Sequence, residues 1–234
     1  NGENILEVKN LKKYFVIKKS LFGKPEAYLK AVDNVSFSVK TGTTIGVVGE
    51  SGCGKTTLGR TILKLYKSDG GQIFFEGQDI TNISRKEMQK YRTDIQLIFQ
   101  DPYSSLPPRM TVGNIIAEAV RIHNIVPKEE VHGYVLDIMK KCGLQPQHYD
   151  RYPHEFSGGQ RQRICIARAL ATHPRYLICD EVSTMLDAVT QAHIWRVLLG
   201  YAEREGAGML LVSHTPALTE RVATRKVKLS RSES

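Results

Sequence analysis

One short motif limits the folds open to this chain more than any other feature of its sequence. Residues 49–56 read Gly-Glu-Ser-Gly-Cys-Gly-Lys-Thr, which fits the pattern Gly-x-x-x-x-Gly-Lys-[Ser/Thr] at every defined position. A β-rich run precedes the motif at residues 44–48, and residues 56–66 follow it with a helical spacing of apolar side chains. A strand, a glycine-rich turn and a helix in this order are typical of a phosphate-binding loop. We therefore predict an α/β fold built around a phosphate site.

The residue types in this motif suit the phosphates of a nucleotide. Glycines allow backbone N–H groups to turn toward a phosphate, and the N-terminus of the following helix adds positive potential. Lys55 supplies a charge for the β- and γ-phosphates, and the Thr56 hydroxyl can bind Mg²⁺. A glycine-rich turn that binds nothing is the alternative, and the flanking strand and helix argue against it. The predicted phosphate-binding residues are Gly49, Glu50, Ser51, Gly52, Cys53, Gly54, Lys55, Thr56 and Thr57.

A second apolar run ends in two carboxylates. Residues 176–179 read Tyr-Leu-Ile-Cys and are followed by Asp180 and Glu181. In open α/β sheets, ligands bind beyond the carboxyl ends of the strands, which is where these acids fall. We expect Asp180 to hold Mg²⁺ and Glu181 to polarise an attacking water. Taken alone, such a pair is more often a helix cap or a surface charge, but with a phosphate loop it favours nucleotide hydrolysis.

Composition excludes several other classes of protein. The chain has 234 residues, of which 41% are apolar and 24% charged, and this balance is typical of a globular protein with a buried core. No apolar stretch approaches the roughly 18 residues of a membrane span, and residues 1–10 do not resemble a signal peptide. The net charge is +9, but the basic residues are spread along the chain, which argues against a nucleic-acid-binding arm. The four cysteines lack metal-site or disulfide spacing, so we expect reduced thiols in a cytosolic protein.

The order of the expected elements indicates one α/β domain with a helical insert. Residues 18–26 contain glycine and proline and should form an excursion like a hairpin. We expect an α/β core at residues 1–100 and 159–234 and a helical subdomain at residues 101–158. The expected strands are residues 5–8, 31–39, 44–48, 72–75, 176–179 and 209–213, and the expected helices are residues 56–66, 112–122, 128–142, 160–171 and 188–203.

Residues 156–160 read Phe-Ser-Gly-Gly-Gln and admit two interpretations. Ser157 and Gln160 have the spacing of a capping box, which would begin a helix. A cap alone does not require Gly158 and Gly159, because adjacent glycines carry an entropic cost. The glycines are needed if a phosphate must approach the backbone.

This segment is the signature of ABC-type ATPases, and the chain closely resembles nucleotide-binding subunits of ABC transporters, specifically those of the peptide/nickel importer family. Three segments carry the resemblance, which covers nearly the whole chain. They are residues 49–56, Gln-Asp-Pro-Tyr-Ser-Ser-Leu at residues 100–106, and Arg-Tyr-Pro-His-Glu-Phe-Ser-Gly-Gly-Gln-Arg-Gln-Arg at residues 151–163. The resemblance implies an ABC-type P-loop NTPase fold, with a core sheet, an antiparallel β subdomain and a helical insert.

The resemblance also implies roles for single residues. Tyr14 matches the aromatic residue that stacks on adenine, and Gln100 matches the glutamine that reaches Mg²⁺ and links the subdomains. Asp187 matches the end of the loop that lies across the dimer interface, and His214 matches the switch histidine at the γ-phosphate. Residues 157–160 would face the γ-phosphate held by another subunit. The implied catalytic residues are Glu181, His214 and Gln100, and the implied Mg²⁺ ligands are Thr56, Gln100 and Asp180.

Three positions depart from the family pattern. Val182 stands where the family usually has proline, and Thr215 stands where it usually has aspartate. Pro107 replaces the usual asparagine of a Leu-Asn-Pro sequence. None of these changes removes a ligand of phosphate, metal or water, so ATP hydrolysis remains the expectation.

The resemblance therefore predicts an ATP-binding and ATP-hydrolysing subunit of an importer for di- or oligopeptides, with ATP and Mg²⁺ at its site. The implied partners are two permease subunits, a second and homologous ATPase subunit, and an extracytoplasmic substrate-binding protein, with no nucleic acid. The chain would lie on the cytoplasmic face of the membrane, held by the permeases. The alternatives are a nickel or metal-chelate importer, a soluble ABC ATPase outside transport, and a weakly hydrolysing regulatory subunit.

Overall fold

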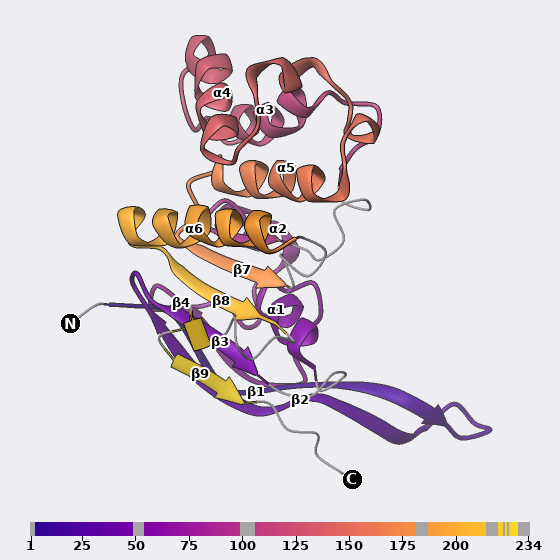
Figure 1. Cartoon of the computed structure of the whole chain (residues 1–234). Coiled ribbons are helices and arrows are strands. Elements are labelled where there is room, and N and C mark those ends of the chain that lie inside the picture. Colours follow the sequence, from indigo (N-terminus) through magenta and orange to yellow (C-terminus); the bar gives the residue numbers. More distant parts are fainter. Residues whose placement is uncertain are drawn as a thin grey trace. The chain divides into compact units, whose positions relative to one another are not determined.

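The computed structural model describes residues 3–48, 54–98, 106–180, 187–213, 220–221, 223 and 225–228 (Figure 1). The chain divides into two units. One consists of residues 1–91 and 208–234, and the other of residues 92–207.

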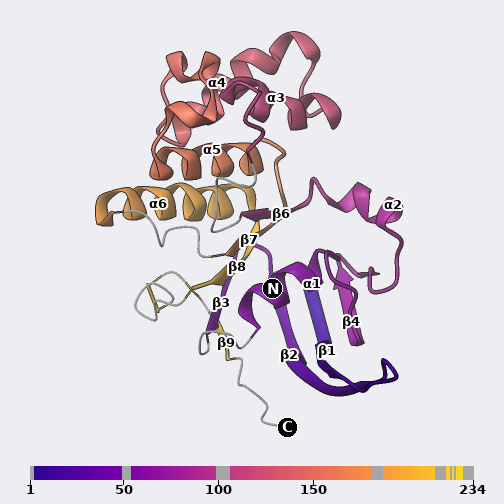
Figure 2. The same ribbon diagram turned by 90° about the vertical axis from the view of Figure 1, so that its right-hand side faces the viewer.

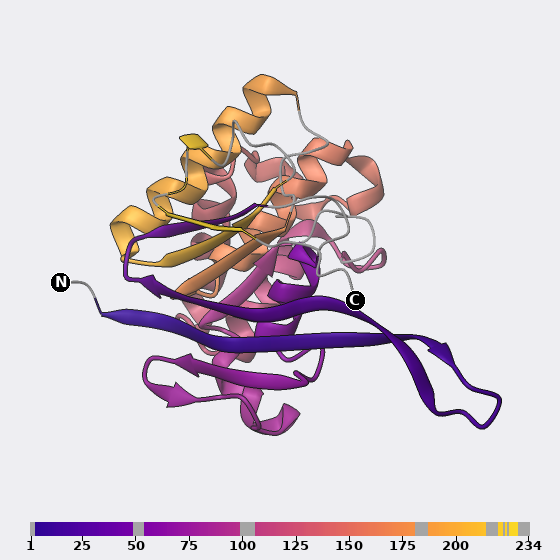
Figure 3. The same cartoon turned by 90° about the horizontal axis from the view of Figure 1, so that it is seen from below.

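The first unit contains a four-stranded antiparallel sheet in the order β2-β1-β4-β5. Along β2 the side chains of Val35, Phe37 and Val39 are buried at every second position, as expected for a strand with one face toward the core. The strands are β1 (Asn4–Lys19), β2 (Pro25–Lys40), β4 (Gly70–Phe75) and β5 (Gln78–Asp79). Strands β1 and β2 are much longer than the runs expected from sequence, and they form a ribbon that is conspicuous in Figure 3.

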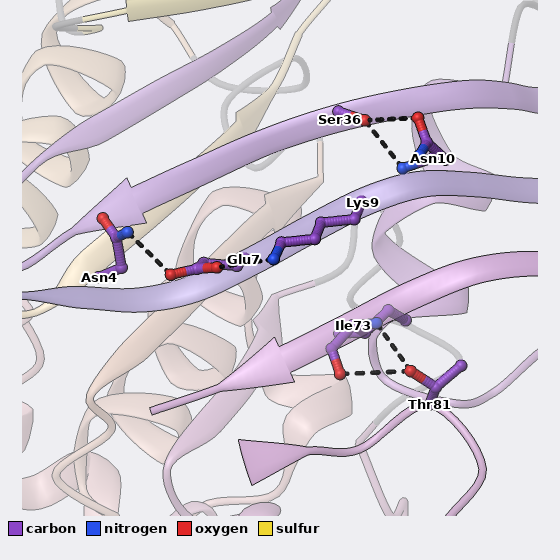
Figure 4. A network of polar contacts seen from close by, with 7 residues as sticks. All are labelled: Asn4, Glu7, Lys9, Asn10, Ser36, Ile73 and Thr81. Carbon is purple, nitrogen blue, oxygen red and sulfur yellow. Dashed lines mark hydrogen bonds and ion pairs between the residues drawn. The ribbon is translucent and has the colours of Figure 1, made fainter. Parts of the chain in front are cut away.

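Side-chain hydrogen bonds support the irregular places of this sheet (Figure 4). Asn10 has a φ of +49°, which asparagine tolerates better than most residues, and it lies where the pairing of β1 with β2 shifts register. The backbone N–H of Asn10 donates to Ser36 Oγ at 2.8 Å, and Ser36 Oγ donates to Asn10 Oδ1 at 3.3 Å. On β4 the backbone N–H of Ile73 donates to the buried Thr81 Oγ1 at 2.8 Å. These hydrogen bonds satisfy polar groups that have no partner in the backbone hydrogen bonding between the strands.

Three parallel strands complete the sheets of the first unit, with β3 in the middle. They are β8 (Gly208–Val212), β3 (Thr44–Val48) and β9 (Arg225–Lys228). Helix α1 (Lys55–Ile62) follows β3 and buries Leu58 and Ile62. The expected helix over residues 56–66 is therefore too long at its end. Lys64 has a φ of +61°, which an α-helix does not allow, so the chain leaves the helix there.

The second unit combines two parallel strands with a group of helices. Strand β6 (Ile95–Ile98) pairs with β7 (Tyr176–Asp180), and all residues of β7 are buried. Helices α3, α4 and α5 pack against one another (Figure 2). The helices of this unit are α3 (Val112–Ile122), α4 (Val131–Lys141), α5 (Gly158–Leu170) and α6 (Ala188–Glu205).

Short helices fill the connections in both units. The first unit has α2 (Arg85–Met88) and a 3₁₀ turn at Gln89–Tyr91. The second has 3₁₀ turns at Lys128–Glu130, Pro146–Asp150 and Pro153–Glu155. The helix expected over residues 128–142 thus begins as a 3₁₀ turn and continues as α4. The predicted fold class, α/β with an antiparallel β portion and a helical portion, is confirmed by the two kinds of sheet and by solved ABC cassettes described below.

Candidate functional site

Gly54 closes the predicted phosphate loop and directly precedes helix α1. Its φ is +92°, and a Cβ at this position would lie 1.7 Å from the carbonyl oxygen of Ala31. Only glycine fits both the backbone conformation and the close approach. Gly54 is the N-cap of α1 and makes no side-chain cap, and the N-terminus of a helix is a favourable place for an anion such as a phosphate. Gly49, Glu50, Ser51, Gly52 and Cys53 lie outside the described residues.

Lys55, Thr56 and Thr57 occupy the first turn of α1. The Lys55 side chain is only 4% exposed, so its charge sits in a medium where attraction to a phosphate is stronger than in water. Thr56 and Thr57 are half-buried. The carbonyl oxygen of Thr57 accepts a hydrogen bond from Thr61 Oγ1 at 2.7 Å, which holds the second turn of the helix. The helix thus fixes the lysine and the threonine hydroxyl next to the loop.

Asp180 lies at the carboxyl end of β7, as predicted, and is 5% exposed. The preceding Cys179 is fully buried, and burial raises the pKa of its thiol to about 12, with the Asp180 charge adding to the effect. The Cys179 thiol is therefore protonated at neutral pH, and the predicted role of Asp180 as a Mg²⁺ ligand stays a prediction. Gln100, Glu181 and His214 lie outside the described residues, so their roles stay predictions.

Tyr14 is held on strand β1 by a set of polar contacts. Its hydroxyl donates to Asp33 Oδ1 at 2.5 Å, and its backbone N–H donates to Asp69 Oδ2 at 2.6 Å. The Lys30 ammonium lies over the ring, 5.7 Å from its centre, and Lys13 pairs with Asp69 at 3.8 Å. The hydrogen bond to Asp33 raises the pKa of Tyr14 to about 12. These contacts hold the Tyr14 ring in one orientation, and its predicted stacking on adenine stays a prediction.

Sequence reasoning identified Tyr14 but missed the residues that hold it. Asp33 and Asp69 are 19 and 55 residues away along the chain, so no local pattern connects them to the tyrosine. The position of Lys30 follows from strand pairing, since it lies directly opposite Tyr14 in the β1–β2 ladder. A correct prediction of the strand register around the hairpin at residues 18–26 would have placed Lys30 opposite Tyr14.

The predicted signature lies at the start of helix α5, with Ser157 as the N-cap. Ser157 Oγ accepts from the backbone N–H of Gln160 at 3.3 Å, and Gln160 Oε1 accepts from the backbone N–H of Ser157 at 3.1 Å. The capping-box interpretation is thus confirmed for these two residues. It does not explain Gly158, because a Cβ there would meet nothing within 4 Å and its φ is not positive. Among the described residues, none lies close enough to exclude a larger side chain at this position.

Asp187 begins helix α6 in a similar way. Its carboxylate accepts from the backbone N–H of Thr190 at 2.8 Å and from Thr190 Oγ1 at 3.1 Å. These hydrogen bonds lower the pKa of Asp187. The residue therefore caps a helix, and its predicted place at a nucleotide interface stays a prediction.

A pocket of about 590 Å³ lies within the second unit, beside the start and end of α3. Ile122, at the last position of α3, is 63% exposed. Sequence analysis named only Pro107 near this pocket, and none of the residues that line it. The pocket lining includes Arg109, Met110, Thr111, Arg121, Ile122 and Tyr152.

Among the residues that the structure describes, no group of three or more His, Cys, Asp and Glu side chains could hold a metal ion. In the same part of the chain, no helix is both long and apolar enough to cross a membrane.

Known relatives agree with the predicted family. The chain is 46% identical over 226 residues to the oligopeptide transport ATP-binding protein AppF of Bacillus subtilis, covering 96% of this chain and 69% of AppF. It is also 46% identical over 225 residues to the glutathione import ATP-binding protein GsiA of Pectobacterium atrosepticum, covering 96% of this chain. The chain spans 36% of the length of GsiA.

Solved structures show the same fold. The dimeric, post-hydrolysis structure of the ATP-binding cassette MJ0796 with ADP and Pi superposes with a TM-score of 0.84 at 27% identity, covering 97% of both chains. The cbiO1 protein from Clostridium perfringens, part of the ABC transporter complex cbiONQ, gives a TM-score of 0.79 at 25% identity, covering 97% of this chain and 85% of cbiO1. Residues 32–184, more than half of the chain, match the sequence profile of the ABC transporter family. The chain therefore belongs to the ABC transporter family and is one of its ATP-hydrolysing cassettes.

Proposed function

We propose that this chain is the ATP-hydrolysing subunit of an importer for di- and oligopeptides. Two of its relatives, AppF and GsiA, are named for oligopeptide transport and glutathione import, and both cargoes are peptides. The shared chemistry of these cargoes supports a peptide over nickel or a metal chelate.

The observation that carries the mechanism is the start of helix α5. Ser157 and Gln160 already satisfy the helix cap, and Gly158 leaves open space where a side chain would stand. A helix N-terminus with open space beside its backbone at this position suits an anion that comes from outside the chain. We infer that Ser157, Gly158, Gly159 and Gln160 contact the γ-phosphate of ATP held by a second cassette.

The nucleotide of this chain would lie on the phosphate loop, with its base against Tyr14. Lys55 and the N–H groups of α1 suit the β- and γ-phosphates. Thr56, Gln100 and Asp180 would hold Mg²⁺, whose charge offsets that of the phosphates. Glu181 would hold the attacking water and His214 would contact the γ-phosphate. Two observations support this site: the close approach of Gly54 to the carbonyl oxygen of Ala31, and the position of Asp180 at the end of β7.

The proposed assembly contains two permease subunits, a second and homologous cassette with Asp187 near the shared interface, and an extracytoplasmic substrate-binding protein, without nucleic acid. The pocket beside α3 has a volume of about 590 Å³, and its apolar residues among charged and polar ones, Arg121 and Glu118 included, suit contact with the end of a permease helix. The chain would thus lie on the cytoplasmic face of the membrane.

The test of this function is the ATP turnover of the assembled transporter with Glu181→Gln in this chain. The amide keeps the shape of the side chain but not its basic oxygen, so we expect turnover to fall on the order of 10²–10³-fold while ATP binding persists. Glu129→Gln, at an exposed glutamate, serves as the matched control. Turnover equal to wild type would remove Glu181 from the mechanism. Stimulation of turnover by binding protein loaded with peptide, and not with nickel, would assign the cargo.

A further inference from the structure

Among the described residues, the end of the β1–β2 ribbon pairs with no strand beyond its own two. Strand β4 pairs with β1 only as far as Lys12, which lies opposite Gly70, whereas β1 and β2 stay paired to Lys19 and Pro25. Phe15 packs edge-on against Tyr66, with ring centres 5.4 Å apart, and this is the last ring contact toward the tip among the described residues. We call residues 16–29 the hairpin tip. Figure 3 shows it projecting beyond the sheet of its unit.

The hairpin tip exposes large apolar side chains at its apex. Leu21 is 103% exposed and Phe22 is 93% exposed, and Ile17 behind them is 66% exposed. The turn is well defined: the backbone N–H of Ser20 donates to the Lys24 carbonyl at 2.8 Å, and that of Gly23 donates to the Ser20 carbonyl at 2.9 Å. The fold therefore holds Leu21 and Phe22 in water, where each forgoes the free energy of burial.

Positive charge surrounds this apolar apex. Residues 12–30 contain six lysines and one glutamate, a net charge of +5, which is more than half of the +9 of the whole chain. Lys18, Lys19 and Lys24 flank the apex and are exposed, and Lys18 lies 3.6 Å from Glu26. An apolar apex flanked by exposed lysines is complementary to a bilayer surface that bears anionic headgroups.

We propose that the hairpin tip inserts Leu21 and Phe22 into the headgroup region of an anionic membrane, with its lysines on the lipid phosphates. A two-stranded ribbon has too little surface to bury such side chains within itself, so the apolar apex needs an outside partner. A second copy of the tip is disfavoured because residues 16–29 carry a net charge of +2, so two tips repel each other. The contact is with lipid itself and would act in addition to any attachment through permeases.

The lysine test uses flotation of the purified 234-residue chain with vesicles of phosphatidylcholine and phosphatidylglycerol. Replacing Lys18, Lys19 and Lys24 together by glutamine should weaken binding about 100-fold, at the usual contribution of each lysine near an anionic surface. The matched control replaces Lys128, Lys140 and Lys141, which are exposed in the second unit, and should bind like wild type. Pure phosphatidylcholine vesicles or high salt should abolish most of the binding.

The apolar test replaces Leu21 and Phe22 by serine, which should weaken vesicle binding on the order of 100-fold. Val189→Ser is the control, because Val189 is 81% exposed in the second unit. Phe22→Trp adds a fluorophore whose emission should shift to the blue on vesicles and be quenched by brominated lipid. The natural Trp195 is only 4% exposed and should not respond.

Four outcomes would overturn the proposal: equal binding to neutral and anionic vesicles, equal loss in the tip and control variants, an unshifted emission from Phe22→Trp, or normal vesicle binding by the tip variants. If those variants bind vesicles normally but no longer assemble with the permeases, the tip contacts protein instead. Lys55→Ala should lose ATP binding and keep vesicle binding, so failure of the nucleotide site and failure of this proposal are distinguishable.

Discussion

At the residue scale, a methyl group at position 54 would meet the carbonyl oxygen of Ala31 at 1.7 Å on a backbone with φ +92°. Gly54→Ala should therefore cost about 1–3 kcal/mol of unfolding free energy from backbone strain alone, and ATP binding should be lost with the loop geometry. Denaturant unfolding and nucleotide titration measure the two effects. Gly133→Ala is the control: its Cβ meets nothing within 4 Å on helix α4, so it should stabilise the chain by about 0.5–1 kcal/mol. Normal ATP affinity of Gly54→Ala would contradict the site.

The contact between Tyr14 and Asp33 gives a second residue-scale prediction. Asp33→Asn weakens a charged hydrogen bond that orients the ring, so we expect ATP affinity to fall several-fold while inorganic tripolyphosphate, which lacks a base, binds as before. Equal losses for both ligands would mean that Asp33 supports the fold and not the base platform.

The same hydrogen bond predicts a pH dependence. The pKa of Tyr14 is raised from 10 to about 12 in the folded chain, so the neutral phenol is favoured by folding. Its stabilising contribution is complete below pH 10 and is lost as pH rises toward about 12. Unfolding of wild type and Tyr14→Phe across this window should show the extra loss in wild type only. Parallel curves would contradict the assignment.

At the element scale, the sequence predicts most clearly those elements whose apolar spacing is regular. The helix over residues 112–122 is observed as expected, because buried side chains such as Val112, Ile116 and Val120 recur at helical spacing in α3. Strand β6 was missed because a four-residue run is too short to show a period. The extent of β1 and β2 was missed because their outer halves carry lysines and exposed apolar residues together, without the alternation of a half-buried strand.

The α3 element carries the prediction on permease contact. Ile122→Ser removes an exposed apolar side chain from the pocket, so the permeases should retain less of this chain in co-purification, while ATP binding stays unchanged. Leu65→Ser is the control, since Leu65 is 40% exposed and lies outside the pocket. Unchanged recovery of Ile122→Ser would place the permease contact elsewhere.

At the scale of the whole molecule, the sequence predicts which residue types form the site better than it predicts how those residues are held in place. The motif at residues 49–56 and the strand ending in Asp180 follow local patterns that a single sequence displays. The support of Tyr14 by Asp33 and Asp69 depends on contacts between distant residues, and the open space at Gly158 depends on what surrounds it. Such features need coordinates.

We infer that the signature of this chain acts on a nucleotide held by another cassette. Gly158→Leu tests this inference, because position 158 has open space around it and the capping box does not involve its side chain. Gly133→Leu on α4 is the matched control, and thermal unfolding should show both variants folded. The measurement is ATP turnover of the assembled transporter beside ATP affinity of the isolated chain. We predict unchanged affinity for both variants, with turnover reduced on the order of 10²-fold for Gly158→Leu alone. Wild-type turnover of Gly158→Leu would show that the segment only caps a helix and would contradict the account.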